Sequence, residues 1–186
     1  ALPISCPSKT LQHITTQKPV MRFTLKGSIK LLFVVVAIGA IRSWQQQGMA
    51  VGQAPPLNAL TIRGEHFSLD TPRETPLVIH FWASWCPICK LEEESIASIA
   101  EDYPVITIAM QSGTSLEVEH YLEEQGIDPT TITDPDGTIA HRFGVQGVPT
   151  SYIVDQNNKI QFSERGYTTE LGLRSRIWLT QLIESR

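Results

Sequence analysis

A chain of 186 residues, 41% of them hydrophobic, can bury one sizeable core but leaves little material for a second. Its charge is uneven: the part up to Arg63 has seven basic residues and no acidic one, whereas the part from Glu65 onward has eight basic and nineteen acidic residues. The acidic part argues against nucleic acid as a partner, and the asymmetry indicates a basic targeting or membrane segment ahead of one folded domain.

The N-terminal part of the chain is interpreted as an extension followed by a leader. Residues 1–20 have no hydrophobic periodicity and are expected to form a disordered extension upstream of Met21, with Cys6 as an incidental unpaired thiol. Residues 31–41 form an unbroken apolar run, too short to span a bilayer alone. Extended over 21–44, the segment reaches a suitable length if the basic residues near its ends snorkel, which predicts one transmembrane helix.

A cleaved signal peptide has the same basic-then-apolar layout and stays open as an alternative to an anchor. The basic residues ahead of the run predict a cytoplasmic N-terminus in a bacterial inner membrane, crossed once, with the rest of the chain in the periplasm or its equivalent. Residues 45–56, which are polar and Pro-rich, predict a linker. The folded domain is therefore expected over 57–186.

Within this domain, apolar runs of strand type alternate with helical spacing. Strands are predicted over 77–83, 105–110 and 151–154 and through Ile160 and Phe162; helices over 88–103, from a capping box at 114–117 to Gly126, and over 169–183. Strands that alternate with helices, and then a hairpin and a helix, indicate an α/β fold with a mixed central sheet flanked by helices.

The chemistry is predicted at the first strand-to-helix junction, where Cys86-Pro87-Ile88-Cys89 opens a helix. The first sulfur, that of Cys86, would lie beside unpaired backbone N–H groups and the positive end of the helix dipole, which favours the nucleophilic thiolate. Pro87 suits the first helical position because its missing N–H costs nothing there. Cys89, three residues on, would lie on the same face and resolve a mixed disulfide formed at Cys86.

Half of a zinc site is the alternative interpretation of a Cys-x-x-Cys motif. A closed zinc site usually needs four ligands, and the only other cysteine is Cys6. The histidines show no paired ligand spacing. The position after a buried strand favours redox chemistry, which needs neither a metal nor a cofactor.

Two segments carry a family resemblance. The segment 81–90, Phe-Trp-Ala-Ser-Trp-Cys-Pro-Ile-Cys-Lys, resembles the active-site segment of thioredoxin-like proteins, and 147–150, Gly-Val-Pro-Thr, resembles their cis-proline loop. The lead-in from Pro55 and the insertion around 112–136 are similar to the membrane-anchored TlpA/ResA/DsbE-like branch. The combination of 86–92 with 109–113 is most similar to its copper-sensitivity-suppressor (ScsD-like) subgroup. The resemblance covers about 55–183 and implies a thioredoxin fold.

The resemblance also implies roles for individual residues. Pro149 would be cis and would leave the backbone of Val148 beside the sulfurs to pair with a substrate strand. Further substrate contacts are implied for Trp85, Pro87 and Thr150. Glu92 matches the acidic residue that this branch places near the inner thiol, where it would accept a proton during resolution. The alternative for Glu92 is one more solvated charge in the run 92–94.

His80 departs from the family pattern, because thioredoxin has a buried aspartate at this place. It would act as a base or support the Cys86 thiolate electrostatically. Equally, it would be a hydrogen-bonded histidine of the core.

Together these features predict a thiol–disulfide oxidoreductase that cycles a Cys86–Cys89 dithiol and disulfide. A monomeric reductase of exported protein disulfides, supplied by a membrane thiol donor, is the favoured direction. The alternatives are a copper-binding module and a thiol peroxidase using the same motif.

Overall fold

The computed structural model describes residues 25–45 and 48–184, and the chain divides into two compact units, 1–40 and 41–186. The prediction for residues 1–20 lies outside the described residues. Helix α1 (Leu25–Gln45) contains the apolar run of the leader. In the described ranges, no helix has both the length and the hydropathy that crossing a membrane requires, so the predicted transmembrane helix over 21–44 is not supported.

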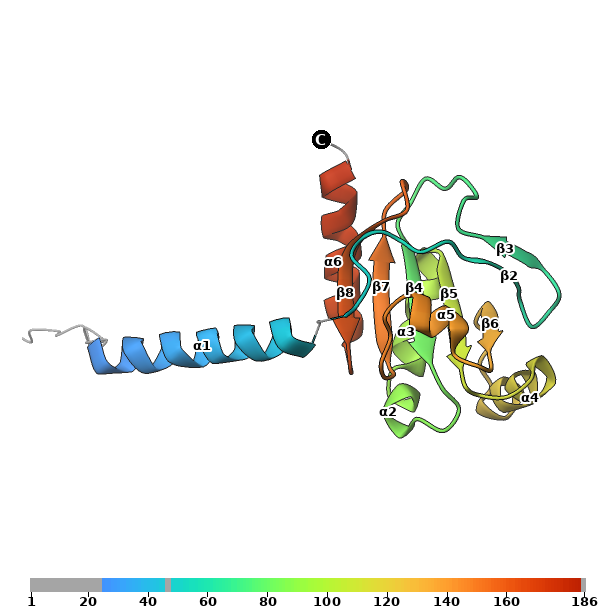
Figure 1. The fold of residues 1–186 in the computed structure, drawn as a ribbon, viewed down its shortest axis with the longest axis horizontal. Helices are drawn as coiled ribbons and strands as arrows, with labels where there is room; N and C mark the ends of the chain where they lie inside the picture. The colour runs from blue at the N-terminus through green and yellow to red at the C-terminus, as the bar shows by residue number, and fades with distance from the viewer. Residues whose placement is uncertain (1–24, 46–47, 185–186) are drawn as a thin grey trace, which may run out of the picture. The chain divides into compact units, whose positions relative to one another are not determined.

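The folded unit is built on a six-stranded mixed sheet (Figure 1). Its strand order is β1-β8-β7-β4-β5-β6. The pairs β4–β5 and β5–β6 are parallel, whereas β4–β7, β7–β8 and β1–β8 are antiparallel. The strands are β1 (Gly52–Gln53), β4 (Leu77–Trp82), β5 (Val105–Met110), β6 (Thr131–Asp134), β7 (Thr150–Val154) and β8 (Lys159–Arg165). This architecture confirms the predicted α/β class with a mixed sheet.

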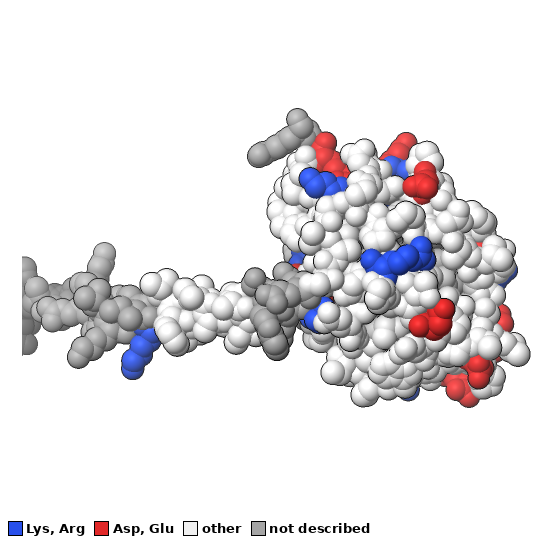
Figure 2. Space-filling view, in the orientation of Figure 1, with Lys and Arg blue, Asp and Glu red and all other residues white. Residues whose placement is uncertain are grey.

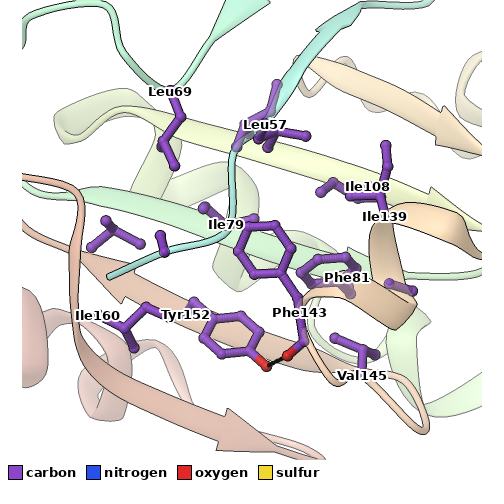
Figure 3. Close-up of a cluster of buried hydrophobic side chains, with 14 of the residues drawn as sticks. Leu57, Leu69, Ile79, Phe81, Ile108, Ile139, Phe143, Val145, Tyr152 and Ile160 are labelled. Carbon is purple, nitrogen blue, oxygen red and sulfur yellow. Dashed lines mark hydrogen bonds between the residues drawn. The ribbon is translucent and has the colours of Figure 1, made fainter. Parts of the chain in front are cut away.

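Strand β4 lies inside the sheet between β7 and β5, and each of its side chains is therefore buried, on one face or the other. Its odd-numbered residues belong to a core that includes a cluster of three aromatic rings, Phe81, Phe143 and Tyr152, with centroids 5.4 to 6.0 Å apart. Figure 3 shows these rings packed together and the hydroxyl of Tyr152 donating to the carbonyl oxygen of Phe143 at 2.6 Å. Helix α5 (Thr138–Arg142) adds Ile139 to this side of the sheet.

On the other face, helices α3 (Glu93–Asp102) and α6 (Glu170–Glu184) cover the sheet. Ile96 and Ile99 of α3 and Leu173 and Ile177 of α6 pack around Val78 of β4. Because side chains alternate along a strand, His80 and Trp82 lie on this face as well. The polar His80 is thus placed in a helix-covered interior.

The predicted single helix over 88–103 is wrong, since the structure divides it into α2 (Pro87–Lys90) and α3. The amide of Leu91 donates to the carbonyl of Ile88, and the amide of Glu92 donates to that of Cys89, both three residues back. These tighter bonds interrupt the α-helical pattern without a proline. The interruption turns the side chain of Glu92 into the interior, where it is 1% exposed.

The predicted linker 45–56 is partly folded onto the domain. Met49 and Ala54 are buried in the main core, and β1 pairs with β8. The packed part of the chain therefore begins before the predicted start at residue 57. A hairpin follows, formed by β2 (Asn58–Leu60) and β3 (His66–Ser68), which sequence patterns did not reveal.

Two further elements, β6 and α5, were also missed, while the capped helix was found. Helix α4 (Ser115–Gln125) has the predicted capping box between Thr114 and Glu117 and ends at Gly126 in the left-handed conformation. Helix α5 begins where the buried carboxylate of Asp134 accepts hydrogen bonds from the amides of residues 139 and 140. That cap lies four residues ahead of the helix rather than next to it, which hides it in the sequence.

Charged side chains on the visible face of the domain are dispersed among uncharged ones (Figure 2). This face has no continuous basic surface of the kind that a phosphate backbone would require.

Candidate active site

The Cys-x-x-Cys motif lies directly after the central strand. Cys86 is the N-cap of α2, Pro87 is its first residue, and the two cysteines are joined by a disulfide with Cα atoms 5.3 Å apart. The amide of Cys89 donates to the Cys86 sulfur at 3.2 Å. An N–H group directed at this sulfur stabilises negative charge on it, so Cys86 is the sulfur better suited to be a thiolate.

A second loop closes over the outer sulfur. The Val148–Pro149 peptide bond is cis, as the family resemblance implies, and the carbonyl oxygen of Val148 lies 3.7 Å from the Cys86 sulfur. Thr150 is buried, and its hydroxyl donates to the carbonyl of Gly147 at 2.7 Å. Its side chain therefore shapes the loop and is not presented to a substrate, whereas the backbone of Val148 is next to the reacting sulfur.

The two tryptophans of the motif have different surroundings. Trp85 is 58% exposed and its indole N–H donates to the carbonyl of Gln111 at 3.0 Å, which holds the ring at the surface next to Cys86. Trp82 is buried and packs on Tyr121 of α4 with ring centroids 5.4 Å apart. Trp85 and Pro87 thus lie exposed beside Cys86, and Trp82 belongs to the core under the disulfide.

Beneath the disulfide lies a buried polar pair, His80 and Glu92. The His80 Nε2 and a Glu92 carboxylate oxygen, Oε2, are 4.0 Å apart, and both side chains are almost completely buried. His80 Nδ1 lies 2.9 Å from the hydroxyl of Ser151 on β7. The other oxygen of Glu92 accepts a hydrogen bond from the backbone N–H of Thr168, in the loop before α6.

Burial shifts both groups of this pair toward their neutral forms. Desolvation lowers the pKa of His80 from 6.5 to about 4. Desolvation also raises the pKa of Glu92 from 4.5 to about 7, against the opposing hydrogen bond from Thr168. Near neutral pH the imidazole is therefore uncharged, and Glu92 exchanges a proton with small changes in pH or local charge, which suits a proton acceptor.

A small cavity of about 30 Å³ lies between β4 and the helices that cover it, and its lining includes His80 and Cys89. Its volume is of the size that one or two water molecules occupy. The inner sulfur and the imidazole therefore face a common space, and the structure brings together the four predicted residues Cys86, Cys89, His80 and Glu92.

Sequence reasoning did not find the partners of the buried pair. Ser151 lies opposite His80 in the β4–β7 register, which no local pattern reveals. Thr168 contributes only its backbone, so its side chain carries no signal. Within the described parts of the chain, no three His, Cys, Asp or Glu side chains are grouped to hold a metal ion. The zinc interpretation would thus have to rely on Cys86 and Cys89, which form a disulfide here.

A mixed sheet with helices on both faces, a disulfide at the start of a helix after the central strand and a cis-proline opposite it define a protein of the thioredoxin-like class. More narrowly, the chain belongs to the AhpC/TSA family, whose sequence profile matches residues 51–163.

Relatives support this assignment. The chain is 26% identical over 159 residues to a thioredoxin-like protein of Haemophilus influenzae, covering 84% of this chain and 95% of the relative. It is 25% identical to the thiol-disulfide oxidoreductase ResA of Oceanobacillus iheyensis, covering 80% of this chain and 83% of the relative. Among solved structures, StoA from Bacillus subtilis aligns with a TM-score of 0.58 at 22% identity, covering 66% of this chain and 96% of StoA. The structural likeness concerns the fold.

Proposed function

We propose that the chain is a thiol–disulfide oxidoreductase that works as a reductase of disulfides in exported proteins. The observation that carries this proposal is the Cys86–Cys89 disulfide at the start of α2, with the carbonyl of Val148 3.7 Å from the outer sulfur. This geometry gives one sulfur a place to meet a partner and the other a place to resolve the adduct. The relatives named as thiol-disulfide oxidoreductases support the same chemistry.

In the first step, the reduced enzyme attacks with the thiolate of Cys86. A bond forms between the Cys86 sulfur and one sulfur of the substrate disulfide, while the other substrate sulfur leaves as a thiolate and takes a proton from solvent. The amide of Cys89 stabilises the attacking thiolate. Exposed Trp85 and Pro87 and the backbone of Val148 form the surface on which the substrate chain would lie.

In the second step, the thiolate of Cys89 attacks the Cys86 sulfur, the intramolecular disulfide forms as the bond to the substrate sulfur breaks, and that sulfur leaves as a thiolate that takes a proton from solvent. Cys89 must lose its proton first, because the thiolate is the nucleophile. Glu92, whose pKa of about 7 lies near neutrality, is the proton acceptor in this scheme. Two electrons thus pass to the substrate, and the enzyme ends in the disulfide state.

The enzyme is then reduced again by a dithiol carrier, for which we propose a membrane thiol protein. We also propose that the leader exports the domain and tethers it at the inner membrane. The support is the charge pattern, seven basic and no acidic residues up to Arg63 followed by an acidic domain. Fractionation of the host tests this: the chain should sediment with membranes and be digested by protease only from the outer side. A cytoplasmic location would contradict it.

The decisive activity test is disulfide reduction by the full chain. Wild type should reduce insulin in the presence of dithiothreitol, Cys86→Ser should lose this activity, and Cys89→Ala should accumulate mixed disulfides. Cys6→Ser is the matched control, since it removes a cysteine that lies outside the motif. Lack of insulin reduction by wild type, or an empty Cys89→Ala trap in the host, would overturn the proposal.

The same protein separates the alternatives. A thiol peroxidase would consume peroxide rapidly through Cys86 without reducing insulin, and a copper-binding module would retain one Cu(I) tightly. For the direction of electron flow, a reductase predicts a potential toward the reducing end of the range from about −270 to about −120 mV. A potential near the oxidising end, with the pair mostly oxidised in the host, would make it an oxidase. Membership of the copper-sensitivity-suppressor subgroup stays a prediction.

A further inference from the structure

The two carboxylate oxygens of Glu92 have unequal surroundings. Oε1 accepts a hydrogen bond from the backbone N–H of Thr168, whereas Oε2 is buried without a hydrogen-bond partner. Nε2 of His80 lies 4.0 Å from Oε2. This is longer than a direct hydrogen bond, so a rotation of the carboxyl group or one bridging water would complete the link. A buried carboxylate oxygen is costly without a donor, and a buried carboxyl proton is costly without an acceptor.

The other nitrogen of His80 has a partner that can both donate and accept a hydrogen bond. Nδ1 lies 2.9 Å from the hydroxyl of Ser151, its register neighbour on β7. A hydroxyl donates as readily as it accepts, and a neutral imidazole carries its proton on either nitrogen. Ser151 therefore allows His80 to present either an N–H group or a lone pair toward Glu92.

We propose that His80, held by Ser151, is a tautomer switch that supplies a hydrogen-bond partner to Glu92 in both of its protonation states. With Glu92 ionised, Ser151 donates to Nδ1, and Nε2–H donates toward Oε2. With Glu92 protonated, Nδ1–H donates to Ser151, and Nε2 accepts from the carboxyl group. A bridging water would preserve the direction of both arrangements, so the switch does not depend on direct contact.

This inference rests on the proposed function, because it explains how Glu92 can take up a proton inside the core. When Cys89 gives its proton to Glu92 during resolution, the carboxylate becomes a carboxyl group without leaving a polar atom unpaired. No net charge is added to the imidazole, which stays neutral throughout, and the proton returns to solvent when Glu92 ionises again. His80 is a positioning residue in this scheme and does not touch the substrate.

The neighbours of the pair leave this role to His80 and Ser151. Thr107 is the register neighbour of His80 on β5, and its hydroxyl is hydrogen-bonded to the hydroxyl of Thr131. The Thr131 hydroxyl in turn donates to the carbonyl of Pro129. Cys89 of α2, held in the disulfide, and Glu93 of α3, which accepts from Tyr121 of α4, line the same cavity as His80. Glu164 of β8 is the register neighbour of Ser151 and pairs with Arg176 of α6 at 2.7 Å.

The test is nitrogen NMR of the imidazole in the oxidised full chain, where Cys89 does not titrate. Between pH 5.5 and 8.5, the ¹⁵N shifts of His80 should exchange from an Nδ1–H to an Nε2–H pattern, with the midpoint of the carboxyl ¹³C titration of Glu92. Glu92→Gln should hold one pattern at every pH. An imidazole that keeps one tautomer in wild type while Glu92 titrates, or that becomes charged in this range, would overturn the proposal.

Two variants at Ser151 separate the switch from mere packing. Ser151→Ala removes the acceptor for Nδ1–H, so the ring should stay in the Nε2–H form and the midpoint of Glu92 should fall by at least half a pH unit. Ser151→Thr keeps the hydroxyl and should keep the exchange. Equal titrations in both variants would contradict the role of the hydroxyl. Because these readouts need no substrate, failure of insulin reduction would reject the proposed function and leave the switch to be judged separately.

Discussion

The buried pair makes a quantitative prediction about stability and pH. His80 has a pKa of about 4 in the folded chain and 6.5 when free, so between these values the unfolded chain binds one more proton. The free energy of unfolding then rises with pH by about 1.4 kcal/mol per unit, about 3 kcal/mol in all. This contribution is complete above pH 6.5 and is lost as the pH falls toward 4.

Glu92 contributes a pH dependence of the opposite sign to the free energy of unfolding. Its pKa rises from 4.5 to about 7 on folding, so between these values the folded chain binds one more proton. The contribution is present below pH 4.5 and is lost as the pH rises through 7. Because the side chain is 1% exposed, solvent screens the shift little, and the loss amounts to about 3 kcal/mol, as for His80. Between about pH 4.5 and 6.5 the two slopes nearly cancel in wild type.

Single substitutions should reveal the pH dependence that each group contributes to the free energy of unfolding. Relative to wild type, Glu92→Gln should gain about 3 kcal/mol of stability from pH 4.5 to 7, and His80→Asn should lose about 3 kcal/mol from pH 4 to 6.5. Urea unfolding of the oxidised chain at four pH values measures both, and the difference from wild type removes the other titrating groups. A cavity left by His80→Asn adds an offset that does not depend on pH. Parallel curves for wild type and both variants would refute the assignment of this pair.

Two predictions concern the scaffold on the opposite face of the sheet. Tyr152→Phe should lower the free energy of unfolding by about 1 kcal/mol, measured by urea unfolding, because the buried carbonyl of Phe143 loses the hydroxyl donor at 2.6 Å and keeps only the amide of Ala50 at 2.9 Å. A loss below about 0.5 kcal/mol would contradict a net stabilising contribution from this hydroxyl. Gly144→Ala should lower the melting temperature more than Gly64→Ala: both glycines have positive φ, but a Cβ at Gly144 would lie 1.8 Å from the carbonyl oxygen of Gly48, whereas Gly64 faces open space. Equal melting temperatures would contradict this close packing.

Much of the sheet was accessible from the sequence because its strands are short, apolar and bounded by turns. β4, β5 and β7 were predicted close to their observed bounds. β1 and β6 were not, since β1 has only two residues and draws its stability from pairing with β8. The break between α2 and α3 was also hidden, because it arises from backbone hydrogen bonds at residues 91 and 92 and not from a proline or glycine. Long-range pairing and local backbone geometry thus account for most of what was missed.

The surroundings of the outer sulfur could be predicted from the sequence more fully than those of the inner sulfur. The surroundings of Cys86 follow from two short sequence motifs, the Cys-x-x-Cys segment and the loop at Val148, each of which is recognisable by itself. The surroundings of Cys89 depend on which of three successive glutamates turns inward, and that choice follows from the helix break and the backbone N–H of Thr168, 76 residues away. A polar His80 in a strand buried on both faces does predict some partner, but not which one.

The two sulfurs of the disulfide therefore have different surroundings, which fit different roles. The outer sulfur lies next to an exposed tryptophan and the backbone of Val148, where the proposed exchange with another protein would take place. The inner sulfur shares a small cavity with His80, where only protons need to move. A substitution on the inner side should therefore alter the pH dependence of resolution while leaving the rate of the first attack unchanged. His80→Asn tests this in stopped-flow experiments: a slower first attack, with an unaltered pH profile of resolution, would mean that His80 supports the Cys86 thiolate instead of Glu92.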